Sequence, residues 1–236
     1  MKHQKSGRCV IVGGAPITDY ENVRRYLRDD DYYIFCDCGL KHLQKLRTPS
    51  GEEVLPAGIV PDLIVGDFDS YERPQLEQDA QLADVETIVL PTVKDETDTA
   101  FASSEGIRRG FRDFLIIGAV GGRMDHTLVN LSLLYKLHKA GCTATLVDDL
   151  SEMTIAKKEP SYIDDSFKYF SLFNMFGPTS DIAITGAKYN VTGAEILPDE
   201  QYATSNEVLP GQTACVTVGE GTLLLIKIRR ELSDLL

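Results

Sequence analysis

The sequence predicts an α/β fold, with an amino-terminal, mostly parallel Rossmann-like sheet and its helices followed by a carboxyl-terminal antiparallel β-sandwich. In residues 1–150, short apolar runs alternate with polar, helix-compatible segments, which is typical of strands joined by helical crossovers. From residue 151 onward, short apolar runs follow one another with turn residues between them and without a strong helical pattern. We therefore expect two domains, at residues 1–150 and 151–236.

Composition and charge narrow the class of protein. Of 236 residues, 43% are hydrophobic and 25% are charged, as in ordinary globular proteins. The formal net charge of −12 argues against nucleic-acid or membrane-surface binding, because both rely on basic patches. The five cysteines are scattered and odd in number, which favours reduced thiols. Because the sequence shows neither a signal-peptide pattern nor a membrane-spanning apolar run, we expect a cytoplasmic protein.

Strands and helices alternate through the first domain. The predicted strands are Cys9–Val12, Tyr32–Cys36, Leu63–Val65, Thr87–Leu90, Phe114–Ile117 and Thr143–Val147. The predicted helices are about Asp19–Arg28, Leu40–Leu46, Glu72–Leu82, Thr99–Arg109 and Asp125–Lys139. Such short apolar runs are typical of strands that are buried on both faces.

The second domain is predicted to contain strands alone. They are Met153–Ala156, Tyr169–Phe173, Ile182–Thr185, Ala214–Val218 and Leu223–Ile228. Glycine- and proline-containing turns separate them, as at 177–178, 192–193 and 210–211. This pattern predicts a small antiparallel sandwich or barrel.

Two aspartates follow the third predicted strand. Gly66 interrupts the apolar run, and Asp67 and Asp69 come next. In an extended backbone, side chains two residues apart point the same way, and two facing carboxylates repel unless a cation lies between them. Ligands commonly bind just past the carboxyl ends of such strands, so a magnesium site for phosphates is the first hypothesis. The alternative is a solvated acidic turn.

A second acidic pair follows the next predicted strand. Asp95 and Asp98 lie three residues apart at a helix start, where the helix dipole tolerates negative charge. Ordinary capping by Asp95 or Thr97 is the alternative reading. The recurrence of an acidic pair after a second strand favours the metal hypothesis.

A loop with three glycines and an arginine follows the fifth predicted strand. Residues 118–126 carry these glycines, and Arg123 stands just before a predicted helix. Free backbone amides, a helix amino terminus and a guanidinium group together make an anion-binding site. His126 and Asn130 lie one turn apart, so either could touch a ligand there. The alternatives are a surface arginine and a capping or packing histidine.

These motifs occur in a recognisable order. The segments are Cys36-Asp37-Cys38-Gly39, Gly66-Asp67-Phe68-Asp69-Ser70, Asp95-Glu96-Thr97-Asp98, Gly121-Gly122-Arg123-Met124-Asp125-His126, Thr185-Gly186-Ala187-Lys188-Tyr189 and Thr204-Ser205-Asn206-Glu207. In this order and at these intervals, the chain resembles the thiamine pyrophosphokinase (thiamine diphosphokinase) family over nearly its whole length.

The resemblance implies a reaction and a set of site residues. Diphosphate would pass from ATP to the hydroxyl of thiamine by Mg²⁺-assisted in-line attack at the β-phosphorus, releasing AMP. A homodimer with active sites between subunits is also implied, with the first domain binding ATP and Mg²⁺ and the second serving thiamine binding and dimerisation. The implied residues are Asp67, Asp69, Asp95 and Asp98 for the metal, Asp67, Asp69, Asp98 and Arg123 for catalysis, Asp37, Thr97, Arg123, Asp125, His126 and Asn130 for the nucleotide, and Ser205 and Asn206 for thiamine.

Some assignments stay open at this point. Asp67 would serve as a metal ligand or as the general base. The chain has no tryptophan, carries Cys38 where the family motif often has glycine, and has Ala187 where leucine is frequent, all of which concern the thiamine pocket. A Mg²⁺-dependent phosphohydrolase with Asp67 as nucleophile and Asp69 as acid/base is the alternative enzyme. A nucleotide or thiamine sensor without turnover is the alternative outside enzymes.

Overall fold

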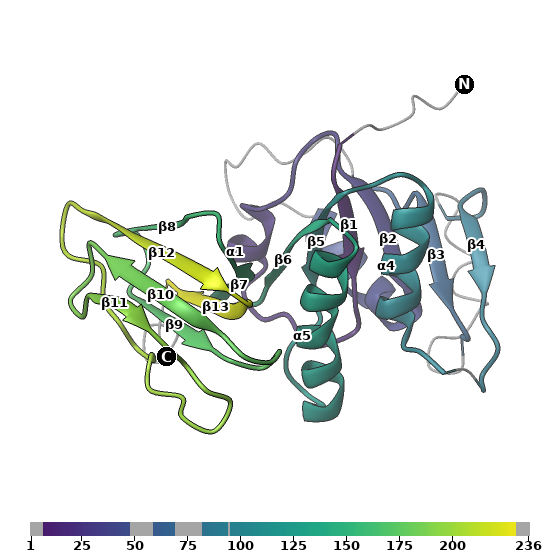
Figure 1. Cartoon of the computed structure of the whole chain (residues 1–236). Helices are drawn as coiled ribbons and strands as arrows, with labels where there is room; N and C mark the ends of the chain where they lie inside the picture. Colours follow the sequence, from purple (N-terminus) through teal and green to yellow (C-terminus); the bar gives the residue numbers. More distant parts are fainter. Residues whose placement is uncertain (1–6, 48–58, 69–81, 94, 230–236) are drawn as a thin grey trace. The chain divides into compact units, whose positions relative to one another are not determined.

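The computed structural model describes residues 7–47, 59–68, 82–93 and 95–229 (Figure 1). The chain divides into two compact units, Met1–Asp149 and Leu150–Leu236. The helix predicted at residues 72–82 lies outside the described residues except for its last residue. Among the described residues, none of the helices is both long and apolar enough to cross a membrane.

Six parallel strands form a sheet in the described part of the first unit. Its strands are β1 (Cys9–Val12), β2 (Tyr32–Cys36), β3 (Leu63–Gly66), β4 (Glu86–Val89), β5 (Asp113–Ile117) and β6 (Thr143–Val147). They lie in the order β4-β3-β2-β1-β5-β6, and each described pairing is parallel. From β1 to β4, each strand is added beside the one before it. The next strand, β5, lies on the opposite side of β1. The strand order therefore reverses between β1 and β5, the kind of position where open α/β sheets bind ligands.

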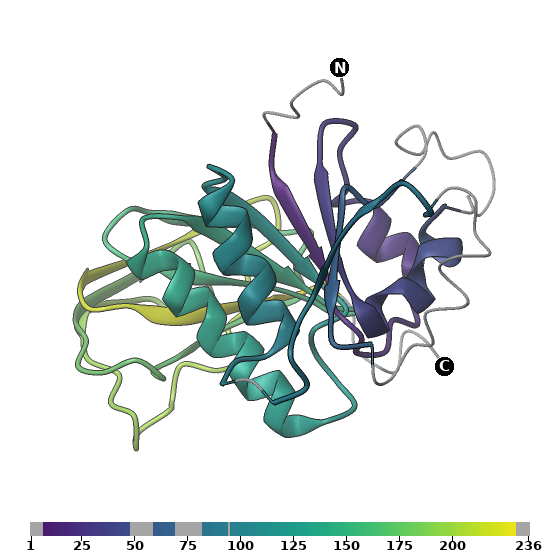
Figure 2. The same ribbon diagram turned by 90° about the vertical axis from the view of Figure 1, so that its right-hand side faces the viewer.

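Helices cover both faces of this sheet. They are α1 (Tyr20–Arg24), the 3₁₀ helix η1 (Asp37–His42), α2 (Leu43–Arg47), α4 (Asp98–Arg108) and α5 (Met124–Lys139). Figure 2 shows the purple and blue helices α1 and α2 on one side of the strands and the teal helices α4 and α5 on the other. Val23 of α1 and Leu43 and Leu46 of α2 pack in one buried cluster with β-strand residues such as Phe35 and Leu115. The predicted parallel α/β architecture is confirmed.

Helix α1 is shorter than the predicted helix at 19–28. Asp19 caps its start by accepting a hydrogen bond from the Asn22 backbone N–H at 3.0 Å. The helix ends at Arg24, and farther on the Arg28 backbone N–H donates to the Asp31 carboxylate at 2.8 Å. Aspartate side chains compete in this way with helical hydrogen bonds, so the predicted end at Arg28 was wrong.

The second unit contains two antiparallel sheets. One has the order β7-β13-β9 and the other β11-β10-β12-β8. The strands are β7 (Ser151–Ala156), β8 (Ser161–Asp164), β9 (Tyr169–Phe173), β10 (Ser180–Thr185), β11 (Val191–Ala194), β12 (Thr213–Glu220) and β13 (Leu223–Ile228). The sequence did not predict β8 and β11, which are edge strands with few buried residues and hence no apolar run.

The two sheets of the second unit share one core. Ile182 and Ile184 of β10 and Val216 of β12 are buried together with Phe170 and Leu172 of β9. Along β10 and β12, buried residues alternate with more exposed ones, as expected when one face of each sheet packs inward. The predicted β-sandwich is confirmed.

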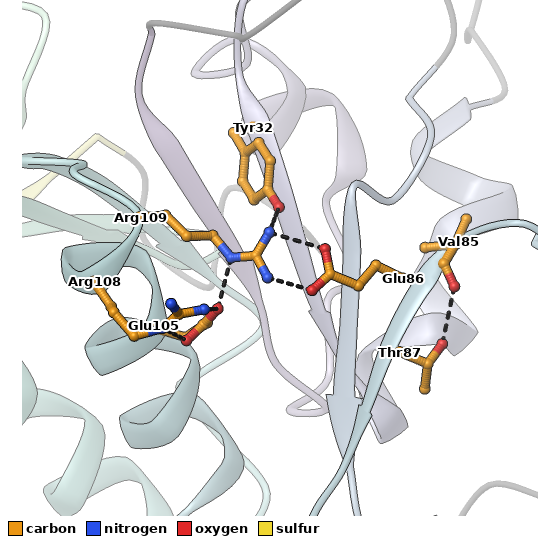
Figure 3. Close-up of polar contacts among 7 residues, drawn as sticks. All are labelled: Tyr32, Val85, Glu86, Thr87, Glu105, Arg108 and Arg109. Atoms are coloured by element: carbon orange, nitrogen blue, oxygen red, sulfur yellow. Dashed lines mark hydrogen bonds and ion pairs between the residues drawn. The ribbon is translucent and has the colours of Figure 1, made fainter. Parts of the chain in front are cut away.

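A charged cluster joins α4 to the edge strand of the first sheet. Arg109, just after α4, donates from Nε to Glu105 at 2.7 Å, from Nη2 to Glu86 of β4 at 2.6 Å, and from Nη1 to the Tyr32 hydroxyl at 2.7 Å (Figure 3). The Glu105 side chain is only 6% exposed, and Arg108 also pairs with it. The guanidinium group of Arg109 thus links the end of a helix to β4, which pairs with β3 alone among the described strands.

Arg109→Met is expected to lower the free energy of unfolding at pH 7 by about 1–3 kcal/mol, because charge-assisted hydrogen bonds are lost. Hydrogen bonds from Arg109 lower the pKa of Glu86, and hydrogen bonds from Arg108 and then Arg109 lower that of Glu105. A folded-state pKa below the unfolded one stabilises the fold at pH values above about 4.3, the ordinary glutamate pKa, and this contribution disappears as pH falls through the lowered pKa.

The loss of unfolding free energy caused by Arg109→Met should therefore be smaller when urea unfolding is measured near pH 3. Arg112→Met is a matched control, because the Arg112 side chain donates hydrogen bonds to the backbone carbonyls of Ile107 and Phe111 rather than to a carboxylate. An equal loss at both pH values would contradict the electrostatic account.

Candidate active site

A cleft of about 890 Å³ opens at the carboxyl edge of the first sheet. Loops after β1, β2, β3 and β5 and the first turns of α4 and α5 line it, so it lies at the position where the strand order reverses. Its lining includes Gly14, Asp37, Asp67, Asp95, Thr97, Asp98, Gly121, Gly122, Arg123, His126 and Asn130. Carboxylates stand on one part of this lining, and a glycine-rich loop with an arginine stands on another.

Three carboxylates meet in this cleft. Asp37 begins η1, Asp67 follows β3, and Asp98 is the first residue of α4. Each offers an oxygen atom, and these three atoms lie within 4.8 Å of one another. Asp37 is 3% exposed, so its charge is largely removed from water. Three negative charges this close repel one another, and a divalent cation between them would offset the repulsion.

The oxygens of Asp37 suit a metal ligand. Oδ1 accepts a hydrogen bond from the backbone N–H of Cys38, whereas Oδ2 is buried and has no hydrogen-bond partner among the described residues. A buried, unpaired carboxylate oxygen is costly unless something compensates it. Magnesium prefers carboxylate oxygens together with water and substrate phosphates, and the three aspartates offer oxygen ligands. The residues present therefore fit a magnesium ion.

Gly66, the last residue of β3, makes this arrangement possible. A Cβ atom on residue 66 would lie 2.6 Å from the Cβ of Asp37, which is too close for two carbon atoms. The strand and the start of η1 can approach each other only because residue 66 has no side chain. Gly66 thereby brings Asp37 and Asp67 into the same cluster.

Gly66→Ala is expected to push Asp37 away from Asp67 and to lower affinity for Mg²⁺. Overpacking of a buried position also costs roughly 1–3 kcal/mol of stability. Titration with Mn²⁺ and thermal unfolding would measure both effects. Gly110→Ala is a useful comparison for stability alone, because a Cβ there meets nothing within 4 Å although its φ of +99° favours glycine. Unchanged Mn²⁺ binding in Gly66→Ala would contradict this role.

The backbone after β3 differs from the prediction. The expectation that Asp67 and Asp69 point the same way assumed an extended chain, but β3 ends at Gly66 and Phe68 has a φ of +56°. A left-handed residue breaks the two-residue period, so the assumed extended chain does not continue through Phe68, and the relative direction of the Asp67 and Asp69 side chains stays a prediction. Phe68 packs against the core cluster of the first unit, which helps to offset the cost of this conformation. Asp69 lies outside the described residues.

The residues of the second acidic segment, 95–98, have different positions and contacts in the site. Thr97 caps α4 by accepting a hydrogen bond from the Ala100 backbone N–H at 3.3 Å, and Asp98 joins the carboxylate cluster. Asp95 lines the cleft but is exposed and is not part of the cluster of three. The amino end of α4 favours the negative charge of Asp98 through the helix dipole.

The glycine–arginine loop, residues 118–123, is shaped by left-handed glycines. Gly121 and Gly122 have φ values of +95° and +69°, and the Gly121 N–H donates to Thr127 Oγ1 at 3.1 Å. Arg123 precedes α5 and pairs with Asp125, with 3.1 Å between Nε and Oδ1. Hydrogen bonding from Arg123 lowers the pKa of Asp125 to about 2. Both side chains are exposed, so an anion in the cleft would compete with Asp125 for the guanidinium group.

His126 and Asn130 both line the cleft but differ in burial. His126 is exposed, whereas Asn130 is 6% exposed and uses its amide inside the protein. Its Nδ2 donates to the Ala119 carbonyl at 2.7 Å, and its Oδ1 accepts from Thr99 at 2.6 Å. Thr99 was not predicted as a site residue, because a threonine in a helical segment carries no functional signal by itself.

The residues predicted for thiamine lie in the second unit. Ser205 is exposed and has a φ of +54°. Asn206 is 5% exposed and holds the backbone of Tyr189, accepting from its N–H at 3.0 Å and donating to its carbonyl at 2.8 Å. Asn206 also lines a mostly aliphatic cavity of about 260 Å³, to which Tyr189 and Tyr202 contribute aromatic rings.

The fold and the site together define an α/β protein with an acidic, anion-adapted cleft at the switch point of a parallel sheet, followed by a β-sandwich. Two family models match these two parts. The thiamin pyrophosphokinase catalytic domain matches residues 23–146, and the thiamin pyrophosphokinase vitamin B1 binding domain matches residues 152–223. The chain belongs to the thiamine pyrophosphokinase family.

Individual relatives agree with this assignment. A thiamine pyrophosphokinase of Bacillus subtilis is 27% identical over 222 residues, covering 92% of this chain and 96% of the relative. The crystal structure of a Bacillus subtilis thiamine pyrophosphokinase matches with a TM-score of 0.80 at 25% identity, covering 95% of this chain and all of the other. That of a Geobacillus thermodenitrificans thiamin pyrophosphokinase matches with a TM-score of 0.77 at 25% identity, covering 96% and 99%.

Proposed function

We propose that this protein transfers diphosphate from ATP to the hydroxyl of thiamine, giving thiamine diphosphate and AMP. The cluster of Asp37, Asp67 and Asp98 at the switch point of the sheet carries this proposal, in a chain that belongs to the thiamine pyrophosphokinase family. Transfer of a diphosphate concentrates negative charge on phosphate oxygens, so catalysis depends on positioning and on charge neutralisation.

Magnesium is the proposed metal. Asp37, Asp67 and Asp98 would hold it, and its positive charge would offset the negative charge of the phosphates. The sequence-based ligand set was Asp67, Asp69, Asp95 and Asp98. The carboxylate cluster supports Asp37 as an additional ligand, Asp95 lines the cleft outside that cluster, and Asp69 stays a prediction for ligand or base.

The remaining groups of the cleft bind and orient the nucleotide. Arg123 and the glycine–arginine loop line the cleft and would bind phosphate, and Thr97 and His126, which also line it, would contribute. A carboxylate, Asp67 or Asp69, would accept the thiamine hydroxyl proton. The hydroxyl oxygen would then form its bond to the β-phosphorus while the bridging oxygen leaves with AMP.

The second unit is proposed to bind thiamine and to form a homodimer. Its cavity joins aliphatic walls with the Asn206 side chain, and Ser205 stands exposed beside it in sequence. Several large apolar side chains of this unit are exposed, namely Tyr162, Met175, Tyr189, Leu197 and Tyr202, which supports an intermolecular surface. Sedimentation velocity of the full chain would test the dimer, and a species at 26.1 kDa alone would count against it. The cytoplasmic location stays a prediction.

The decisive test is to incubate the full chain with ATP, Mg²⁺ and thiamine and to separate the products. Thiamine diphosphate and AMP in equal amounts are expected. Free phosphate released without any dependence on thiamine would favour the phosphohydrolase alternative, and binding of ATP or thiamine without any product would favour a sensor.

A further inference from the structure

A chain of hydrogen bonds runs from the start of α4 to the loop after β5. The Ala100 N–H donates to Thr97 Oγ1 at 3.3 Å, and Thr97 Oγ1 lies 3.1 Å from Thr99 Oγ1. Thr99 Oγ1 donates to Asn130 Oδ1 at 2.6 Å, and Asn130 Nδ2 donates to the Ala119 carbonyl at 2.7 Å. Thr99 is 8% exposed and Asn130 is 6% exposed, so water has little access to the middle of this chain.

The direction of each hydrogen bond follows from the chemistry of its ends. The Ala119 carbonyl can only accept, which places the Asn130 amide nitrogen next to it and the amide oxygen next to Thr99. The single hydroxyl proton of Thr99 is therefore committed to Asn130. Thr97 must then donate to Thr99 while it accepts from Ala100. Each hydroxyl both donates and accepts, an arrangement in which neighbouring hydrogen bonds strengthen one another.

The two ends of this chain belong to different parts of the cleft. Asp98 lies between Thr97 and Thr99, so residues on both sides of the carboxylate-bearing position are fixed by hydrogen bonds. Ala119 lies in the glycine–arginine loop, between Gly118 and the left-handed Gly121. Asn130 reaches from α5 to both parts.

We propose that Thr99 and Asn130 are positioning residues that keep the carboxylate of Asp98 at a fixed position relative to the glycine–arginine loop. This inference rests on the proposed function, in which one metal–nucleotide complex contacts both parts of the cleft. Neither residue needs to touch the nucleotide. Their hydrogen bonds set how far the metal-binding carboxylate lies from the loop that receives the phosphates.

The expected effect is that of groups that orient metal ligands. Loss of such a partner typically lowers metal affinity or activity about 10- to 100-fold. Thr99→Val keeps the shape of the side chain and removes the hydroxyl, whereas Thr99→Ser keeps the hydroxyl. Ser104→Ala is the matched control, because Ser104 links the same two helices through a hydrogen bond from Lys136 Nζ at 3.2 Å and is absent from the cleft lining.

The test measures Mn²⁺ affinity by electron paramagnetic resonance in the presence of a nonhydrolysable ATP analogue, together with the thermal midpoint and the steady-state constants for thiamine. In Thr99→Val we expect Mn²⁺ affinity and kcat to fall about 10- to 100-fold with little change in KM for thiamine. Thr99→Ser should restore both, and Ser104→Ala should match the wild type. Asn130→Asp, which replaces the donor to Ala119 by an acceptor, should reproduce the loss if Thr99→Val does not fold.

Wild-type Mn²⁺ affinity in Thr99→Val and Asn130→Asp would overturn the proposal, as would a lowered thermal midpoint without any change in Mn²⁺ affinity or kcat. Absence of Mn²⁺ binding by the wild-type protein would overturn it as well. If the wild type binds Mn²⁺ but makes no thiamine diphosphate, the proposed function fails while the affinity comparison still tests the positioning role.

Discussion

Asp98→Asn is expected to lower turnover roughly 100- to 10,000-fold, because it removes a carboxylate from the cluster with Asp37 and Asp67. An amide has no negative charge to hold a divalent cation. The metal-free protein should keep its stability to within about 1 kcal/mol, because the lost helix-dipole interaction and the relieved repulsion among carboxylates oppose each other. Steady-state assays and urea unfolding would measure the two effects.

Metal addition provides a second measurement on the same variant. A ligand that binds only the folded state raises the unfolding midpoint, so Mg²⁺ with an ATP analogue should stabilise the wild type more than Asp98→Asn. Asp95→Asn is the matched control, since Asp95 lines the same cleft outside the cluster of three. Equal losses in the two variants would show that the cluster does not define the metal site.

Arg8→Met is expected to lower the free energy of unfolding by about 3–5 kcal/mol, because it removes the guanidinium group that offsets the charge of the buried Asp31 carboxylate. Arg8 contacts Asp31 through two hydrogen bonds, at 3.0 Å from Nε and 2.9 Å from Nη2. The two side chains are 8% and 0% exposed. This pair joins the segment before β1 to the segment before β2, and neither residue lines the cleft, so the loss should be one of stability.

Two further variants test whether the loss arises because the ion pair is buried. Arg28→Met removes the side chain of an exposed pair, in which Arg28 Nη1 lies 3.7 Å from Asp113 Oδ2, and should cost less than about 1 kcal/mol. The double variant Arg8→Met with Asp31→Asn should cost less than the sum of the single changes, because no buried negative charge is left without the guanidinium group that offset it. A loss below about 1 kcal/mol for Arg8→Met would contradict the buried-pair account.

Most of the fold was predictable because parallel strands buried on both faces must be almost wholly apolar. Cys9–Val12 and Tyr32–Cys36 were placed at their observed bounds for this reason. The edge strands β8 and β11 escaped prediction, since a strand that buries little surface needs no apolar run. Helix ends were less predictable where an aspartate, such as Asp31, binds the backbone and competes with the helix.

The site was predictable in outline but not in its contacts. Asp67 and Asp98 were expected from acidic pairs that follow strands, and both lie in the cluster. Asp37 was assigned to the nucleotide, and only the tertiary structure shows that it stands beside the other two carboxylates. Thr99 carried no signal, because its importance arises from a hydrogen bond to a residue 31 positions away.

The sequence by itself determined the fold class, the family resemblance and the residue types of the cleft, because apolar periodicity and motif spacing are local properties of the chain. The tertiary structure decided which carboxylates share one cluster and which groups the Asn130 amide binds. It also decided that the chain leaves the extended conformation at Phe68. These features depend on distances between segments far apart in sequence, which β-strand pairing and helix packing set and which no local pattern encodes.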